Sequence, residues 1–337
     1  MTSNKTLAAC LIACGCIAAA LPASAADPAC LKAPGTIGFL PKMDTDPYFH
    51  VARQGALDAQ KEIGGKLIQQ APSTATADAQ IEFVNALVAQ KVDVLVVSST
   101  DANALAPALR RARGQGVRVM TYDSDATREA RTLFINQARS DSLALQMLDS
   151  MGALIGYSGE FAILSSTPTA TNQNTWISVM KAQLANNPKF AQMKLVQVAY
   201  GEESEQINQQ QALALAEAFP NLKGILVPAG IGLPAAARAL EQSGGIQKIK
   251  LTGVAPATFM KKYIEAGNAQ DIWWNVSDLG YLAYHAAQQL AQCKITGKKG
   301  ESFTAGRLGS YTILDNGEIV LGEAEIVTPK NLQKFKF

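Results

Sequence analysis

Strand-like and helix-like segments alternate strictly along this chain. Short apolar runs such as 93–98, with three valines and one leucine, are typical of parallel strands buried on both faces. Segments with apolar residues at helical spacing, such as 78–90, follow them. Because a crossover must carry the chain back before a parallel neighbour can start, this alternation predicts parallel sheets with right-handed crossovers. The pattern restricts the fold to the α/β class.

The alternation falls into two series. The first predicts strands at 36–40, 66–68, 93–98, 117–122 and 132–135. The second predicts strands at 160–164, 194–199, 224–227, 249–253 and 270–274, with helices that include 174–186 and 277–295. These strands suit two sheets of about five or six strands better than one long sheet. We therefore expect an α/β fold of two doubly wound parallel-sheet lobes; the architectural alternative is a (β/α)₈ barrel.

The tail after the last predicted helix is irregular. Residues 311–314 and 319–320 flank Asp315-Asn316-Gly317, which predicts a β-hairpin with Asn-Gly in its turn. We expect the chain to pass between the lobes near 136–139, 271–276 and 305–310, so that three segments form a hinge. The expected N-terminal lobe is 31–137 plus 276–306, and the expected C-terminal lobe is 138–275 plus 307–337.

The first 26 residues have the features of a secretory signal peptide. A positively charged start and an apolar run from Leu7 to Leu21 precede the small residues of Ala23-Ser24-Ala25. No later segment has the roughly 18 unbroken apolar residues that a membrane span needs. We expect 1–26 to be removed and the mature protein to be exported. Cys10 and Cys14, each in a loosely lipobox-like sequence, keep lipoprotein processing as an alternative.

The composition excludes several classes of protein. A hydrophobic content of 48% and a net charge of +2 are ordinary for a globular protein and argue against disorder and nucleic-acid binding. His50 and His285 are far apart, and no Cys/His cluster has metal-ligand spacing, so we expect no metal and no cofactor. Cys30 and Cys293 follow the signal peptide; export permits a disulfide between them, and two separate thiols are the alternative.

Polar side chains follow several predicted strands. The stretch 165–175, between the strand at 160–164 and the helix predicted from 174, is rich in hydroxyl and amide groups. In open α/β sheets, ligands bind at the carboxyl ends of strands. Donors and acceptors without a nucleophile–base pair suit a neutral polyhydroxyl ligand, although the same residue types are usual in turns and N-caps. Lys42 and Asp123 place similar polar groups after two strands of the first series.

Short motifs along the chain resemble one family. They are Phe39-Leu40-Pro41-Lys42, Thr121-Tyr122-Asp123-Ser124-Asp125, Ile135-Asn136-Gln137, Thr171-Asn172-Gln173-Asn174-Thr175-Trp176, Leu233-Pro234-Ala235-Ala236-Ala237 and Trp274-Asn275. In order and spacing the chain resembles type I periplasmic sugar-binding proteins of ABC importers, and more closely the branch that binds rhamnose or autoinducer-2. The resemblance covers essentially the whole mature chain. It implies a monomeric, non-enzymatic periplasmic protein that carries a small sugar or furanosyl-type ligand to the membrane subunits of an ABC permease.

The resemblance divides between two ligands. In the autoinducer-2 branch, ligand contacts lie at positions matching Lys42, Asp123, Asn172, Gln173, Pro228 and Gly230. Asn172 stands where that branch has Asp, and Gly230 stands where it has Ala, whereas the other four positions keep the expected residue. The run Asn172-Gln173-Asn174 is more similar to the rhamnose branch. The resemblance therefore implies a small deoxy sugar such as rhamnose, with autoinducer-2 as the alternative.

The polar candidates have distinct chemical roles. The carboxylate of Asp123 can accept two hydroxyl hydrogen bonds, and such charge-assisted bonds are strong. Lys42 can donate to a ring oxygen or hydroxyl, while Asn172 and Gln173 both donate and accept, as hydroxyl groups do. The alternatives are a cap or turn role for Asp123 and Asn172 and a solvated surface position for Lys42. Asn275, at an expected hinge segment, could reach the ligand from behind or belong to a β-turn.

Apolar and backbone contacts complete the expected site. Phe49 and Trp274 are expected to pack on the C–H face of a pyranose, although the hydrophobic core is the alternative for any aromatic residue. Pro228 and Gly230 would bring the backbone close to the ligand, because Gly has no Cβ. The ligand would bridge the lobes and stabilise a closed form that the free protein already reaches.

Three other functional classes are the alternatives. An exported α/β enzyme lacks support because the chain has no G-x-S-x-G, P-loop or H-E-x-x-H motif. Asp123 and Asp125 lie too close in sequence to be read as a glycosidase pair. A sugar-responsive repressor would need DNA-binding helices where the signal peptide stands. A sensor coupled to a chemoreceptor is compatible with transport.

Overall fold

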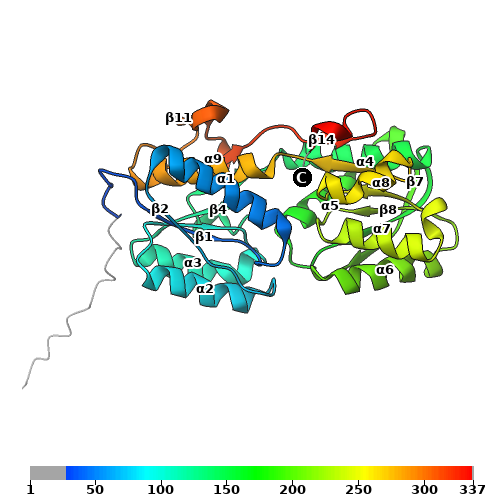
Figure 1. The fold of residues 1–337 in the computed structure, drawn as a ribbon, viewed down its shortest axis with the longest axis horizontal. Coiled ribbons are helices and arrows are strands. Elements are labelled where there is room, and N and C mark those ends of the chain that lie inside the picture. Colours follow the sequence, from blue (N-terminus) through cyan, green and yellow to red (C-terminus); the bar gives the residue numbers. More distant parts are fainter. Residues whose placement is uncertain (1–27, 336–337) are drawn as a thin grey trace, which may run out of the picture.

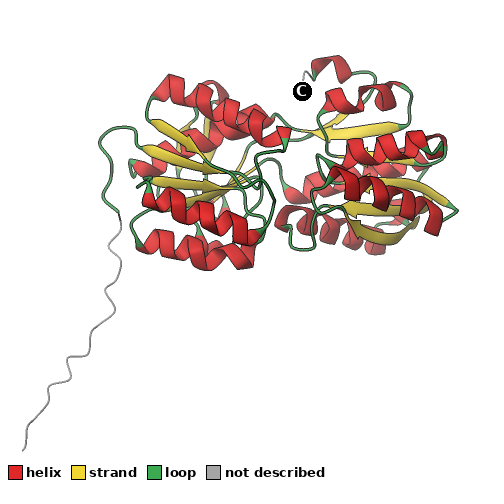
Figure 2. Cartoon of the chain, turned by 60° about the horizontal axis from the view of Figure 1, so that its bottom comes forward, coloured by secondary structure: helices red, strands yellow, loops and turns green. Residues whose placement is uncertain are grey.

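The computed structural model describes residues 28–335. They form two lobes arranged side by side along the longest axis of the molecule (Figure 1). In each lobe a twisted sheet lies between layers of helices (Figure 2). The predicted signal peptide, 1–26, lies outside the described residues. Within the described part, none of the helices combines the length and the apolar character that crossing a membrane requires.

The first lobe contains a six-stranded sheet in the order β13-β5-β4-β3-β1-β2, and every neighbouring pair is parallel. Its strands are β1 (Thr36–Leu40), β2 (Lys66–Gln69), β3 (Val94–Val97), β4 (Arg118–Tyr122), β5 (Leu133–Asn136) and β13 (Glu318–Val320). Its helices are α1 (Pro47–Ile63), α2 (Ala77–Ala89), α3 (Ala102–Gly114) and α9 (Val276–Ala291). Helices α1 and α9 cover one face of the sheet, and α2 and α3 cover the other (Figure 1).

The second lobe has a six-stranded sheet in the order β14-β10-β9-β8-β6-β7, in which β14 alone runs antiparallel to its neighbour. Its strands are β6 (Ser158–Ser165), β7 (Gln192–Tyr200), β8 (Leu222–Val227), β9 (Lys250–Gly253), β10 (Ala269–Trp273) and β14 (Glu325–Val327). Its helices are α4 (Ser140–Ile155), α5 (Thr171–Asn186), α6 (Glu205–Ala218), α7 (Gly232–Gln242) and α8 (Ala257–Glu265). Two open sheets confirm the predicted fold class, and the barrel alternative is wrong.

Helices α1 and α9 touch backbone to backbone. A Cβ on Gly55 would lie 1.7 Å from the carbonyl oxygen of Ser277, and a Cβ on Gly280 would lie 1.8 Å from that of Ala52. Only glycine permits such an approach, because it has no side chain at these two positions. The first turn of α9, which follows directly on β10 of the other lobe, is therefore fixed on the first lobe.

The tail of the chain differs from its prediction. Strand β12 (Ser310–Thr312) pairs antiparallel with β11 (Ser302–Thr304), whereas β13 pairs in parallel with β5. The expected hairpin between 311–314 and 319–320 is therefore wrong, although Asn316 does make a tight turn at φ 59°. The free edge of β5 offers backbone donors and acceptors that β13 satisfies, and this long-range pairing outweighs the local hairpin.

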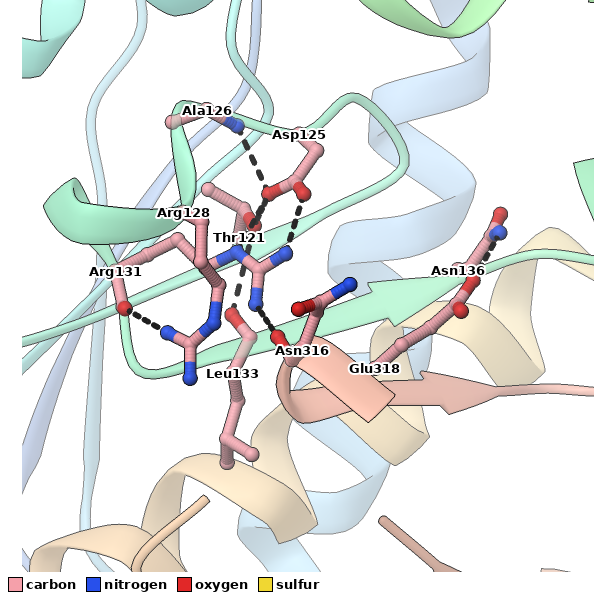
Figure 3. Close-up of polar contacts among 9 residues, drawn as sticks. All are labelled: Thr121, Asp125, Ala126, Arg128, Arg131, Leu133, Asn136, Asn316 and Glu318. Carbon is pink, nitrogen blue, oxygen red and sulfur yellow. Dashed lines mark hydrogen bonds and ion pairs between the residues drawn. The ribbon is translucent and has the colours of Figure 1, made fainter. Parts of the chain in front are cut away.

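Side chains hold the returning segment against the first sheet (Figure 3). Arg131 donates to both carboxylate oxygens of Asp125, at 2.9 and 2.6 Å, and to the carbonyl of Asn316. The amide of Asn136 donates to Glu318 at 2.7 Å. The chain thus leaves the first sheet after Val320, whereas the expected passage was near 305–310. Residues 307–320 therefore pack with the first lobe, although they were expected to belong to the second.

The structure joins Cys30 and Cys293 by a disulfide with a Cα–Cα distance of 5.3 Å. Cys30 precedes β1, and Cys293 follows α9, so the bond fastens the start of the first lobe to the end of the helix that enters it. Of the two alternatives for these cysteines, the disulfide is the one in the structure.

Removal of this disulfide should lower the stability of the protein. The bond closes a loop of sequence separation 263, so it restricts the unfolded chain strongly. We expect the Cys30→Ser/Cys293→Ser variant to lose about 2–5 kcal/mol of unfolding free energy, measured by urea unfolding under non-reducing conditions. Reduction of the wild-type protein should give a similar loss. Equal urea midpoints for the variant and the oxidised wild type would contradict the prediction.

Asp271, in the middle of strand β10 of the second sheet, makes stability depend on pH. Its carboxyl is fully buried and accepts a hydrogen bond from the backbone N–H of Ala255 at 2.8 Å. Burial raises the pKa of Asp271 well above its usual value. A carboxyl whose pKa is higher in the folded state stabilises the fold at pH values below its pKa in the unfolded state. This stabilisation is lost as the pH rises through the pKa of the folded state.

The isosteric variant Asp271→Asn tests this effect. It keeps a carbonyl oxygen for the Ala255 N–H but cannot ionise. Between pH 4.5 and 8, urea unfolding should show a smaller loss of stability for the variant than for the wild type, by about 1 kcal/mol or more. If the unfolding free energies of the two proteins changed in parallel with pH, Asp271 would not be the source of the pH dependence.

Candidate functional site

A cavity of about 40 Å³ lies between the lobes, at the carboxyl ends of strands from both sheets. Eight of the nine predicted site residues line it: Lys42, Phe49, Asp123, Asn172, Gln173, Pro228, Gly230 and Trp274. The first three come from the first lobe, the next four come from the second lobe, and Trp274 stands where the chain passes from β10 to α9. The prediction that polar strand ends meet at one place therefore agrees with the geometry.

Asp123 anchors a chain of hydrogen bonds on the first-lobe side of the cavity. It is buried directly after β4 with a left-handed backbone, φ 61°. Ser98 donates to one carboxylate oxygen at 2.6 Å, and the Tyr48 hydroxyl donates to the other at 3.1 Å. Trp274 Nε1 donates in turn to the Tyr48 hydroxyl at 3.1 Å. Each carboxylate oxygen can accept more than one bond, so Asp123 keeps acceptor capacity for a ligand.

Two residues of α5 supply amide groups from the second lobe. This helix begins at Thr171, three residues before the predicted start, so Asn172 and Gln173 lie in its first turn and not in a loop. Gln173 Nε2 donates to the carbonyl of Pro228 at 3.2 Å. Its Oε1 is buried without a hydrogen-bond partner among residues 28–335 and can accept a further hydrogen bond.

Asn172 also connects the lobes. Its Oδ1 accepts a hydrogen bond from Ser124, which follows β4 of the first lobe, at 3.4 Å. The same atom accepts the backbone N–H of Gln173 at 3.0 Å. This contact bridges the cleft, so the structure has its lobes together.

Aromatic rings form the apolar wall of the cavity. Trp274 lies edge-on to Trp176 and to Tyr48, with ring centroids 6.4 and 6.3 Å apart. Phe49 meets Tyr48 edge-on at 5.1 Å. Trp273 stacks on Trp274 at 6.0 Å and does not line the cavity. The rings leave an apolar surface beside the carboxylate and amide groups, which is the combination that a sugar ring needs.

Asn275 is not brought to the cavity. Its side chain is exposed and caps α9, where Oδ1 accepts the backbone N–H of Asp278 at 3.0 Å. The expectation that it reaches a ligand from behind does not agree with this position. A helix N-terminus has free N–H groups, and Asn is a preferred residue for satisfying them.

Five further residues line the cavity and lie outside the predicted set: Asp46, Tyr48, Trp176, Glu203 and Val254. Four of these follow the strands β1, β7 or β9, so the strand-end rule that found Lys42 also applies to them. Trp176 lies one helical turn after Asn172 and Gln173, and so on the same face of α5.

Acidic groups dominate the charge of the cavity. Burial and the nearby Glu203 raise the pKa of Asp46 to about 7. Burial and Asp123 raise the pKa of Tyr48 well above its usual value, so its hydroxyl keeps the proton that it donates. Asp125, by contrast, is held by Arg131 and does not line the cavity, so Asp123 and Asp125 do not form a catalytic pair there.

Comparison with known proteins identifies the family. The family described as periplasmic binding protein domain matches residues 37–299. The structure is similar to an ABC transporter solute-binding protein from Clostridium phytofermentas with bound L-rhamnose: 34% identity, 90% of this chain and 98% of that chain covered, TM-score 0.86. A sugar ABC transporter protein from Actinomyces odontolyticus is 36% identical, with 90% and 98% covered and TM-score 0.72.

A third structure supports the fold alone. LsrB from Clostridium saccharobutylicum in complex with AI-2 is 21% identical, with 90% of this chain and 100% of that chain covered and TM-score 0.83. The family match covers most of the described residues, and two of the three proteins exceed 30% identity over nearly their whole length. The chain belongs to the periplasmic binding protein family, as a type I solute-binding protein of a sugar ABC transporter and not an enzyme.

Proposed function

We propose that this protein binds a small neutral sugar, first of all L-rhamnose, in the cavity between its lobes and delivers it to an ABC permease. The observation that carries the proposal is one cavity with Asp123 and Lys42 from one lobe and Gln173 from the other. A hydroxyl both donates and accepts, so a ring of hydroxyls can use carboxylate, ammonium and amide groups at once. Trp176 and Trp274 offer aromatic surface for the C–H face of the ring.

The charge of the cavity favours a cargo without negative charge. Asp46, Asp123 and Glu203 line it together with a single cation, Lys42. A sugar acid or sugar phosphate would bring a further anion into a site with poor solvent screening, where like charges repel strongly. A neutral sugar brings no charge of its own, so it can use these charged groups as hydrogen-bonding partners.

Similarity to a solved relative supports the choice of L-rhamnose. The protein from Clostridium phytofermentas has this sugar bound and shares 34% of its residues with this chain. Autoinducer-2 is the second candidate cargo. Lys42, Asp123, Gln173 and Pro228 match the residue types of the autoinducer-2 branch, and all four line the cavity.

Delivery requires the lobes to separate. A cavity of about 40 Å³ is far smaller than the roughly 300 Å³ or more of typical ligand sites. Cargo therefore enters an open form of the protein. Closure then brings the two lobes together into one surface that the permease recognises, and a chemoreceptor would recognise the same surface. The chain can bend where it passes between the sheets, after β5, β10 and β13. We further infer that the signal peptide directs the mature monomer to the periplasm.

A thermal-shift screen tests the cargo. The mature protein is heated with L-rhamnose, L-fucose, D-ribose, D-galacturonate or autoinducer-2. A ligand at about 100 times its Kd adds roughly 2.7 kcal/mol of stability, so a true cargo gives a clear rise in Tm. L-Rhamnose should give the largest shift and D-galacturonate none. A shift with autoinducer-2 alone selects the second candidate, and no shift with any neutral compound overturns the proposal.

Asp123→Asn should weaken L-rhamnose binding. The substitution removes the charge from a carboxylate that receives hydrogen bonds, and a charged partner contributes about 1.5–3 kcal/mol. Isothermal titration calorimetry should therefore show an affinity loss of roughly 10- to 100-fold. Asp78→Asn, an exposed position in the first turn of α2, is the matched control and should leave the affinity unchanged. An unaltered affinity in Asp123→Asn would remove Asp123 from the site.

A further inference from the structure

Asp46 and Glu203 stand between two cavities. Asp46 lies between β1 and α1 of the first lobe, and Glu203 lies between β7 and α6 of the second. Both line the inner cavity of about 40 Å³ and also an outer one of about 380 Å³. Phe259, which is half exposed, and Arg238 line the outer cavity on its other sides. The two acidic side chains are thus part of the wall that separates the inner cavity from the outer one.

Neither acid has a cation as a close partner within the described part of the chain. Arg238 is paired with Glu205 at 2.5 Å, and Lys42 forms no ion pair with Asp46 or Glu203. Asp46 accepts the backbone N–H of Tyr48 at 2.9 Å as the N-cap of α1.

The loop that carries Glu203 is held in an uncommon conformation. Glu202 and Glu203 both have φ 52°, a left-handed backbone that is unusual for two successive residues with side chains. Backbone bonds from Gly201 to Ser165 and from Glu202 to Ser166, of 2.8 and 2.9 Å, fix the loop to the end of β6. Such strain is typical of functional sites, and here it fixes an acid at the rim of the cavity.

We propose that Asp46 and Glu203 form a carboxyl gate: they stand on opposite lobes at the boundary of the two cavities, Asp46 holds a proton when the lobes close, and both groups thereby determine the affinity for cargo. The closing step needs no assumption about the cargo. The effect on affinity rests on the proposed function.

The charges around the gate determine whether closure weakens or strengthens as the pH rises. Asp46 faces the carboxyl groups of Glu203 and Asp123, which raise its pKa, and Lys42, which lowers it by less. With the lobes together, burial and Glu203 raise the pKa of Asp46 to about 7. In an open cleft, water would solvate the same carboxyl, for which the usual pKa is about 4. Closing therefore takes up a proton between these two values. Closure should weaken as the pH rises through this window, by at most roughly tenfold per pH unit, and become constant above about pH 7.

Tryptophan emission can follow closure without any ligand. The chain has three tryptophans, and Trp176, Trp273 and Trp274 lie together at the cleft and the adjoining passage. In the wild type, emission should shift to longer wavelength as the pH rises from 5 to 9, with a midpoint at or below about 7. Asp46→Asn should abolish this transition, and Glu203→Gln should move it to lower pH or abolish it. Asn is itself a good N-cap, so α1 should still form in the first variant.

Two controls make the titration specific. Glu202→Gln removes the same charge from the adjacent exposed position and should keep the wild-type transition. His50→Gln removes the exposed imidazole of α1 and should also keep the wild-type transition. A wild-type transition that persists in Asp46→Asn, or the absence of any transition in the wild type, overturns the gate.

Calorimetry with L-rhamnose gives the second readout. From pH 5.5 to pH 7.0, the wild-type affinity should fall by up to roughly 30-fold, and that of Asp46→Asn should change by less than about threefold. If the affinities of the wild type and Asp46→Asn changed equally with pH, the link between the gate and the affinity would be refuted. If L-rhamnose binds at no pH, the proposed cargo is wrong, while the emission titration still decides whether the gate exists.

Discussion

The hydrogen-bond chain Trp274–Tyr48–Asp123–Ser98 connects the first-lobe wall of the cleft to the passage between the lobes. Trp274 lies on the passage between the lobes, Tyr48 begins α1, and Asp123 and Ser98 follow two central strands of the first sheet. Because these groups are buried, leaving any one unpaired is costly, and the chain of bonds fixes the ring of Trp274 relative to the carboxylate. The polar and aromatic sides of the cavity are thus positioned by the same interactions.

Much of this arrangement follows from short sequence patterns and can therefore be predicted from the sequence. Alternating apolar runs and helical spacing set both sheets, and the carboxyl end of a parallel strand is a position that local pattern identifies. This pattern identifies Lys42 and Asp123, and both line the cavity; Pro228, which the family resemblance supplied, lines it too. The family resemblance added Gly230 and pointed to residues of α5, where the pattern alone allowed a capping role.

The features that the sequence did not reveal depend on contacts between segments that are distant in sequence. Asn275 has the chemistry of a ligand residue, but the N-terminus of α9 uses its side chain. Asp46 and Glu203 each look like an ordinary loop acid until the two lobes are placed together. The turn at Asn316 was recognised, yet the partner of the strand after it is β5, which no local pattern reveals.

The pairing of β13 with β5 has a consequence for how the molecule is assembled. Asn136 and its partner Glu318 are 182 positions apart, and the whole of the second sheet except β14 is encoded between them. Contacts of such long sequence separation form slowly, and a chain still emerging from the ribosome cannot make them. The edge of the first sheet therefore stays uncovered until synthesis is almost finished, so the first lobe cannot complete its fold on a partly made chain.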